Sequence, residues 1–467
     1  MLTRRHFLTA ATAGLGLLAA GCSTDNSSGT SAQPSVPPVS TVPPAPGAGE
    51  LKVSSFQLFT QEDLNFQSMI ALGASGISAA VGEVLTAVNQ ANAAPGGASY
   101  QSVYDAWIAS GNLLTQQADE ALKAGHKVTA SARYMRAAQY YNQALFWVLG
   151  TSTPGAEAQV YGSMNAAWTA ANSLARPAPE SVSVPYEDHP LPGWFFSGGS
   201  GTRPVVIMNN GSDGQNVDML AEGGDAALER GYHVFIFEGP GQGSMLFEHN
   251  IVFRPDWEKV ITPIVDYLGG RDDVDKDKIV LHGISLGGYF VARAAAYEHR
   301  LAAVIADPGL DSSWRAFPES IKKIAEAGPA EVVNKIWADD VIAGASPQES
   351  FALRKRLEIY TAEAHDEAAA GQIPTDWYGI SRRVQEFTLS PEQMAAITSP
   401  TLVTDYVEDI FFGDGPTALY DGLTVEKKKF IRFGETNGAQ YHDAPVASQY
   451  VGEVILDWVD ETIGYQG

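Results

Sequence analysis

The fold of this chain is decided by residues 278–288, which read KIVLHGISLGG. The apolar residues 279–281 predict a buried strand, and the pattern G-x-S-x-G around Ser285 leads into an apolar helical stretch, 286–297. A strand–turn–helix of this kind presents a serine hydroxyl above a sheet, because flanking glycines let neighbouring backbone approach closely. The Leu286 N–H, at the helix start, can then donate a hydrogen bond to an oxyanion. A chance match is the competing interpretation, and the flanking strand and helix argue against it.

Short apolar runs alternate with helical stretches on both sides of this motif. Continuous apolar strands separated by helices are typical of a parallel sheet covered on both faces. Between 310 and 397 no strand is predicted and the pattern favours helices, at 319–326, 330–342 and 349–365. We therefore predict an α/β fold with a helical insertion between two late strands. The predicted strands are 205–208, 233–237, 279–281, 302–306, 401–403 and 430–433.

Residues 63–174 have a helical pattern throughout. Tyr134, Ala138, Tyr141 and Leu145 recur at steps of four and three, which marks one buried face of a helix. We interpret this aromatic stripe as core packing of an α-helical domain. The predicted domains are a signal segment (1–21), a tether (22–50), a helical cap domain (51–180), the first part of the α/β core (181–310), a helical cap insertion (311–398) and the second part of the core (399–467).

The composition limits the classes of partner. Of 467 residues 45% are hydrophobic, and 30 Lys and Arg stand against 54 Asp and Glu, a net charge of −24. So acidic a surface repels phosphate backbones, which excludes nucleic acid as an expected partner, and it disfavours adsorption to anionic lipid unless a covalent anchor is present. The one cysteine, Cys22, excludes disulfides, zinc–thiolate sites and iron–sulfur clusters within one copy of the chain.

The first residues resemble an export signal. Arg4 and Arg5 precede an apolar run, 7–20, that is too short to span a hydrocarbon core of ~30 Å. A paired arginine before such a run is typical of twin-arginine export. Residues 18–22 resemble a bacterial lipobox in which Cys22 is acylated, although Leu18 lies one position farther from the cysteine than usual. We expect a lipoprotein on the extracytoplasmic face of the cell membrane; an ordinary cleaved signal is the alternative.

A serine of ordinary pKa needs a base, and three histidines follow Ser285 in the chain. His299 ends the predicted helix and lies too far from the top of the sheet, and His365 lies in the insertion. His442 follows the last predicted strand, so it is the expected base. A solvated loop histidine is the competing interpretation.

The acid that orients this base should follow the penultimate strand. Four candidates lie there: Asp405, Glu408, Asp409 and Asp414. Asp405 still belongs to the strand end and Asp414 lies beyond the aromatic pair 411–412, which favours Asp409. Its role would be to hold the imidazole tautomer and to stabilise the imidazolium.

The second oxyanion donor is expected in the loop 209–214, NNGSDG, which follows an early strand. Ser212 is the first choice for this donor and Asp213 the next. The turn 237–243, FEGPGQG, has the glycines of a nucleotide-binding loop but not their spacing, and no lysine follows it. We interpret it as a structural turn beside the site, and we expect no metal and no organic cofactor.

Together these stretches resemble the α/β-hydrolase superfamily. Within it they are similar to the branch with an N-terminal helical domain, which includes 2,6-dihydropseudooxynicotine hydrolase and the fungal polyketide-shortening pigment hydrolases. The resemblance rests on the Tyr134 helix, the loop 210–214, the turn 239–243, the Ser285 elbow, residues 409–412 and residues 438–442. In this branch an aspartate just before an aromatic pair is the triad acid, which implies Asp409. Glu238 departs from the branch, where an aspartate is more usual, so substrate preference does not carry over.

The resemblance implies a Ser285–Asp409–His442 triad that acts through an acyl-enzyme on an ester, or on a C–C bond beside a ketone. The aromatic residues of both helical parts favour a small, hydrophobic carbonyl substrate in a largely enclosed pocket. Two other functions stay open at this point: an exported peptidase or amidase, and an inactive hydrolase-fold binding lipoprotein. A homodimer is also left open.

Overall fold

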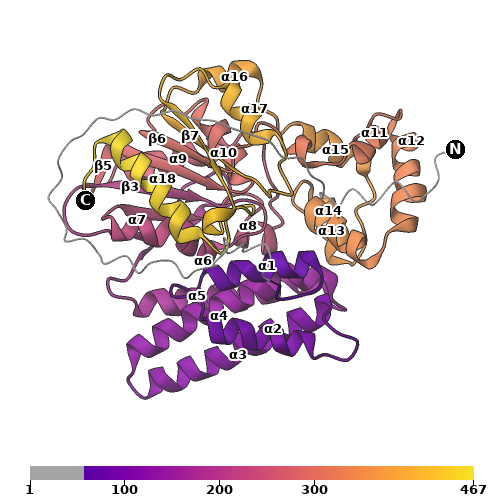
Figure 1. The fold of residues 1–467 in the computed structure, drawn as a ribbon, viewed down its shortest axis with the longest axis horizontal. Helices are drawn as coiled ribbons and strands as arrows, with labels where there is room; N and C mark the ends of the chain where they lie inside the picture. Colours follow the sequence, from indigo (N-terminus) through magenta and orange to yellow (C-terminus); the bar gives the residue numbers. More distant parts are fainter. Residues whose placement is uncertain (1–56) are drawn as a thin grey trace, which may run out of the picture.

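The computed structural model describes residues 57–467 (Figure 1). The predicted signal segment (1–21) and the whole predicted tether (22–50), which includes Cys22, therefore lie outside the described residues. Within 57–467, no helix combines the length and the apolar character needed to cross a bilayer.

The described chain begins with a helical region, as predicted. Neighbouring helices pack along one another, and a Cβ on Gly111 would lie 2.7 Å from the Tyr141 ring, so glycine permits the close contact of the third and fourth helices. Tyr134, Tyr141 and Leu145 are buried, which agrees with core packing. The helices are α1 (Glu62–Gly73), α2 (Val81–Asn92), α3 (Tyr100–Lys123), α4 (Lys127–Trp147) and α5 (Glu157–Leu174).

A single eight-stranded sheet follows, with the strand order β1-β2-β4-β3-β5-β6-β7-β8. The pairs from β4 to β8 are parallel, whereas β1 and β2 join antiparallel at one edge. The predicted α/β fold with a mainly parallel sheet is confirmed. The strands are β1 (Glu180–Val184), β2 (Leu191–Phe196), β3 (Arg203–Asn209), β4 (His233–Phe237), β5 (Val274–Ile284), β6 (Ala303–Asp307), β7 (Thr401–Tyr406) and β8 (Lys428–Phe433).

The antiparallel strands β1 and β2 were not among the predicted strands. Pro192 and Gly193 interrupt the apolar pattern of β2, and both residue types weaken a strand signal. The Pro192 carbonyl still accepts a hydrogen bond from Glu238 N–H at 2.9 Å. The two strands extend the sheet toward the helical region.

Helices cover both faces of the sheet. Figure 1 shows α7 and α18 on the near side of the sheet, with α9 and α10 behind it, and each pair packs together. Both faces of the sheet are therefore buried from solvent, which explains why the strands are apolar along their whole length. The core helices are α6 (Asn216–Met219), α7 (Asp225–Glu229), α8 (Gly243–Phe247), α9 (Glu258–Gly269), α10 (Gly287–Ala295), α17 (Gly415–Gly422) and α18 (Ser448–Ile463).

The segment between β6 and β7 is helical, as predicted. Most of its helices form the orange group beside the core in Figure 1, whereas its last helix, 391–396, packs against α10 and α17 of the core. The predicted helix 349–365 is instead two helices. Thr361 restarts the helix because its side chain accepts the Ala364 N–H at 3.1 Å, and the Ile359 carbonyl accepts the Phe253 N–H of the core at 2.9 Å. The helices are α11 (Glu319–Ala325), α12 (Ala330–Ile336), α13 (Pro347–Leu357), α14 (Ala362–Ala369), α15 (Trp377–Gln385) and α16 (Pro391–Ala396).

Two buried acids of the core hold the helical region. Asp218, on α6, accepts hydrogen bonds from Gln139 Nε2 at 2.8 Å and from Asn142 Nδ2 at 2.6 Å. Glu238, after β4, accepts the Tyr161 hydroxyl at 2.8 Å. Because buried carboxylates need such donors, the helical region and the loops at the carboxyl ends of β3 and β4 are fixed to one another.

Candidate active site

Ser285 lies at the turn between β5 and α10. Its φ of +57° is in the left-handed region, which non-glycine residues rarely adopt. Two hydrogen bonds hold this conformation: Ser285 N–H donates to the Asp307 carbonyl at 2.7 Å, and Gly288 N–H donates to the Ser285 carbonyl at 2.8 Å. A Cβ on Gly288 would lie 1.9 Å from the Pro308 carbonyl oxygen, so this packing requires glycine. The turn presents the Ser285 side chain at the carboxyl end of the sheet.

His442 lies on the loop that follows β8, opposite this turn. Its Nε2 is 2.9 Å from Ser285 Oγ. The ring is 4% exposed, and the rings of Phe411 and Phe412 contact it edge-on, with centroid distances of 4.7 and 4.9 Å. These contacts hold the orientation of the imidazole and exclude water from its sides.

Asp409 lies on the loop that follows β7 and contacts the other nitrogen of His442. Its Oδ2 is 2.8 Å from His442 Nδ1. Its Oδ1 accepts the backbone N–H groups of Phe411 at 2.7 Å and Phe412 at 3.1 Å. Burial alone would raise the pKa of Asp409, but the charge of His442 and these hydrogen bonds bring it below its ordinary value. The carboxylate is therefore ionised and fixed, as a group that orients an imidazole must be.

The loop after β3 lies against the Ser285 turn. A Cβ on Gly211 would lie 2.8 Å from Ser285 Cβ and 3.0 Å from the Leu286 nitrogen. The Gly211 N–H is occupied by its neighbour Asn210, whose Oδ1 accepts it at 2.7 Å. Within 57–467, the N–H groups of Leu286 and Ser212 have no backbone or side-chain acceptor. Two free N–H donors therefore lie on the two loops that meet at Ser285.

The predicted structural turn after β4 supports this loop. Gln242 Nε2 donates to the carbonyls of Asn210 at 2.8 Å and Gly211 at 3.1 Å. Its Oε1 accepts the Gly239 N–H at 3.0 Å. The sequence GPGQG thus holds the candidate oxyanion loop through Gln242.

Comparison with known proteins agrees with this fold. A model of the alpha/beta hydrolase family matches residues 217–412. Hydrolase LUC6 of a Fusarium species is 28% identical over 440 residues, which cover 87% of this chain and 98% of the relative. The 20-hydroxy-prefusarin hydrolase FUS2 of Gibberella moniliformis is 27% identical over 432 residues, with coverage of 87% and 98%. The chain has the α/β-hydrolase fold and is similar to these hydrolases over most of its length.

Solved structures show the same fold for this α/β hydrolase. The crystal structure of 2,6-dihydroxy-pseudo-oxynicotine hydrolase aligns with a TM-score of 0.61 at 20% identity, covering 86% of this chain and 97% of that one. The wild-type structure of AbyA5 aligns with a TM-score of 0.55 at 16% identity, covering 86% and 99%. Both alignments extend beyond the sheet, since they cover most of each chain. The chain is a hydrolase.

Three of the other candidates weighed from the sequence have partners of their own. Asp405 and Asp414 were weighed as the acid, and each is instead paired with an arginine. His299 was weighed as the base, and its Nδ1 lies 3.2 Å from Thr398 Oγ1. The two ion pairs are Asp405–Arg432 at 3.1 Å and Asp414–Arg315 at 2.9 Å.

Two charged residues beside the site were not predicted. Arg356, on α13 of the insertion, donates to the Asp213 carboxylate, and its guanidinium carbon is 5.0 Å from the Phe411 ring centroid. Asp443 follows His442 directly, and its Oδ2 is 3.2 Å from His442 Nε2. The sequence could not point to Arg356, because it lies far from every motif along the chain. Asp443 could have been found, because it directly follows the expected base.

These charges set the protonation of His442. Burial lowers the pKa of His442, but the charges of Asp409 and then Asp443 outweigh burial and raise this pKa to about 9. The positive charge of Arg356 lowers the pKa of His442. The imidazole of the resting α/β hydrolase is therefore strongly basic.

One group of buried residues has the donor types of a metal site. Glu157, Glu358 and His365 offer ligand atoms that all lie within 4.8 Å of one another. Lys355 Nζ, however, is 2.7 Å from Glu358 Oε1 and 3.6 Å from Glu157 Oε1. The Lys355 ammonium group thus already lies beside both carboxyl groups, where a metal ion would otherwise supply positive charge. The cluster links α5 to the insertion through ion pairs.

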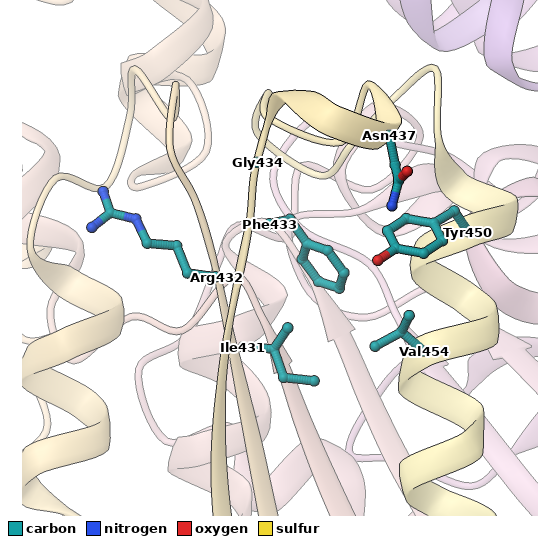
Figure 2. Close-up of a pocket in the computed structure, with 7 residues that line it drawn as sticks. All are labelled: Ile431, Arg432, Phe433, Gly434, Asn437, Tyr450 and Val454. Atoms are coloured by element: carbon teal, nitrogen blue, oxygen red, sulfur yellow. The ribbon is translucent and has the colours of Figure 1, made fainter. Parts of the chain in front are cut away.

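Two pockets can be described. One of about 220 Å³ lies between β8 and α18, where Phe433 and Tyr450 face each other (Figure 2). The other, of about 450 Å³, is lined by residues such as Tyr161, Trp194 and His249. Neither is lined by Ser285, so the enclosed substrate pocket expected from the sequence stays a prediction.

Proposed function

We propose that this α/β hydrolase is a serine hydrolase that cleaves a carbonyl-centred bond of a small hydrophobic molecule. Ser285 is the nucleophile, His442 the base and Asp409 the orienting acid. The observation that carries the proposal is the continuous chain from Ser285 Oγ to His442 Nε2, 2.9 Å, and from His442 Nδ1 to Asp409 Oδ2, 2.8 Å. Such a chain activates a hydroxyl that is otherwise a weak nucleophile.

In the first step, Ser285 Oγ bonds to the substrate carbonyl carbon while His442 Nε2 takes the hydroxyl proton. The N–H groups of Leu286 and Ser212 bind the oxyanion that forms. When this intermediate collapses, the bond to the leaving group breaks and His442 returns the proton to that group. Water then attacks the acyl-enzyme, again with His442 as base, and releases a carboxylic acid and free Ser285.

The leaving group can be an alkoxide oxygen or the α-carbon of a ketone. Both accept one proton from His442, so the triad serves ester and C–C cleavage equally. The relative FUS2 is a 20-hydroxy-prefusarin hydrolase by name, which supports a small organic molecule as substrate. Phe411 and Phe412 against the base favour aromatic or other apolar groups near the scissile bond.

The test is labelling by a fluorophosphonate probe together with turnover of an aryl ester. Wild-type protein should be labelled, and Ser285→Ala should lose both labelling and roughly 10⁴-fold or more of kcat. Ser173→Ala, an exposed serine on α5, is the matched control and should behave as wild type. Activity of Ser285→Ala above about a tenth of wild type would overturn the proposal.

A comparison of cleavage rates by the wild-type protein identifies the class of bond that it hydrolyses. We expect aryl esters and aryl β-diketones to be cleaved faster than aminoacyl arylamides or denatured protein. Faster cleavage of arylamides would instead support a peptidase. Failure of the probe to label folded wild-type protein would support a binding lipoprotein without activity.

We also propose export and lipid anchoring at Cys22, which the sequence motivates through Arg4, Arg5 and the residues before the cysteine. The full chain should distribute to the membrane fraction of a bacterium that has twin-arginine export, with a palmitate or similar acyl group on Cys22. Cys22→Ser should shift it to the soluble fraction. A wild-type protein that is already fully soluble would contradict the anchor.

A further inference from the structure

His442 Nε2, the atom that takes the proton from Ser285, has two neighbours. Ser285 Oγ lies at 2.9 Å and Asp443 Oδ2 at 3.2 Å. A neutral imidazole nitrogen that lacks hydrogen accepts one hydrogen bond, and a protonated one donates one. Ser285 and Asp443 therefore compete for the same nitrogen.

The backbone holds Asp443 in this position. Its φ is +59°, and that of Ala444 is +45°, two consecutive non-glycine residues in the left-handed region. Ala444 N–H donates to the Tyr441 carbonyl at 2.8 Å, and the Ala444 side chain is fully buried. The Asp443 side chain is 17% exposed, and its Oδ1 has no hydrogen-bond partner within the described residues. A carboxyl group is thus fixed between the imidazole and the Ser285 backbone, whose hydrogen bond lowers its pKa.

The other charged groups around Asp443 are mostly acids. Asp307, at the end of β6, is paired with His282 Nε2 at 3.2 Å and accepts the Tyr406 hydroxyl. Burial, and after it the charges of Asp307 and Asp409, raise the pKa of Asp443 to about 8, although the charge of His442 opposes this. Glu222, from the turn after α6, interacts with Asp443 and also has a raised pKa, caused first by burial.

We propose that Asp443 is a positioning residue that governs when His442 can act as the base for Ser285, an inference that rests on the proposed function. Asp443 and His442 share one proton in two arrangements. With the proton on Asp443, His442 Nε2 is free to accept from Ser285 and the enzyme is competent. With the proton on His442, the imidazolium is paired with the Asp443 carboxylate and Ser285 has no base.

Removal of the carboxylate abolishes the second arrangement. His442 then loses its proton at lower pH, because one of the two negative charges that stabilise the imidazolium is gone. The acid limb of kcat/KM should consequently move to lower pH. A residue with a purely structural role would lower activity at every pH without moving this limb.

The experiment is the pH profile of kcat/KM from pH 5 to 10 with a neutral aryl ester, for wild type, Asp443→Asn, Asp443→Ala and Asp421→Asn. Asp421 is exposed on α17 and serves as the control. Both Asp443 variants should shift the midpoint of the limb down by about half a unit or more, about a threefold gain in the fraction of free base on the acid side. An unmoved midpoint in a folded Asp443 variant would overturn the inference.

A second measurement needs only wild-type protein, so it tests the inference even if the Asp443 variants do not fold. In wild-type protein, the NMR titration of the His442 ring should show two coupled steps, because two groups share the proton. One step near the ordinary histidine pKa of about 6.5 would overturn the inference. Ser285→Ala in the same series separates the two proposals. Residual activity of Ser285→Ala defeats the proposed function. If Ser285→Ala is inactive but the acid limb of the Asp443 variants does not move, only the role of Asp443 is defeated.

Discussion

The two helical parts of this α/β hydrolase meet the core in different ways. The N-terminal helices are attached through buried acids of the core, Asp218 and Glu238, which accept hydrogen bonds from Gln139, Asn142 and Tyr161. The insertion between β6 and β7 instead reaches the loops that carry the reactive residues through cations, Arg356 beside Asp213 and Arg315 beside Asp414. Both parts approach the ring of Phe411 beside His442, α1 through Phe66 at 5.7 Å and the insertion through Arg356 at 5.0 Å, so they differ in the kind of contact that attaches them.

This difference separates three kinds of effect. Substitutions in the loops of the core should stop the chemistry. Substitutions where the N-terminal helices attach should lower stability, because buried carboxylates and amides lose their partners. Substitutions of Arg356 should change turnover only modestly, since the guanidinium is partly exposed. The predictions below test these three classes in order of expected size.

The largest effect is expected for Asp409→Asn. The amide cannot hold the Nδ1–H tautomer of His442, and kcat should fall by roughly 10⁴-fold while the fold is retained. Asp405→Asn and Asp414→Asn are the matched controls, since both acids are paired with arginines and should keep most of the activity. Steady-state kinetics with an aryl ester and a circular dichroism spectrum of each variant suffice. Comparable damage from Asp414→Asn would reopen the choice of acid.

The second effect concerns pH. His442 acts as base only when it is deprotonated, and its pKa is raised to about 9, so kcat/KM should rise with pH through the alkaline range. At pH 7, about two units lower, activity should be about a hundredfold below the plateau. The sequence alone predicts a midpoint near 6.5, because it shows the histidine without its two carboxylates. A plateau already reached at pH 7 would show that substrate binding or Asp443 protonation removes this shift.

The third effect is on stability and tests the attachment of the helical region. Asp218→Ala should lower the free energy of unfolding by about 2–4 kcal/mol, because it leaves Gln139 and Asn142 as buried donors without an acceptor. Asp376→Ala, which removes an exposed cap of α15 in the insertion, should cost only about 1 kcal/mol. Urea unfolding of both variants measures the difference. Equal losses would mean that the buried hydrogen bonds of Asp218 stabilise the protein no more than an exposed helix cap does.

Much of this architecture follows from the sequence, because its strongest signals are local. A strand, a glycine-flanked serine and a helix are adjacent around Ser285, and the position of His442 follows from the order of the strands. The expected placement of Ser285, Asp409 and His442 agrees with the distances found, while their catalytic role remains a proposal. The α/β fold itself is confirmed.

The parts that were missed depend on contacts between distant residues. Strand β2 carries Pro192 and Gly193, so only its pairing with β1 and β4 reveals it. The break near Thr361 comes from a contact of the insertion with the core. Arg356 and Asp443 are ordinary charged residues in the sequence, and their importance arises from the loops that lie opposite them.

The smallest effect is expected for Arg356→Met. The guanidinium is 38% exposed, so its ion pair with Asp213 is worth about 0.5–1 kcal/mol, or about two- to fivefold in kcat/KM. Loss of its positive charge also raises the pKa of His442, because Arg356 lowers that pKa in the wild type. The acid limb should therefore move to higher pH, opposite to the shift expected for Asp443→Asn. Arg354→Met, on the same helix, is the control and should leave both quantities unchanged. A hundredfold loss would place the insertion within the chemistry, and no change would show that it does not reach the reaction.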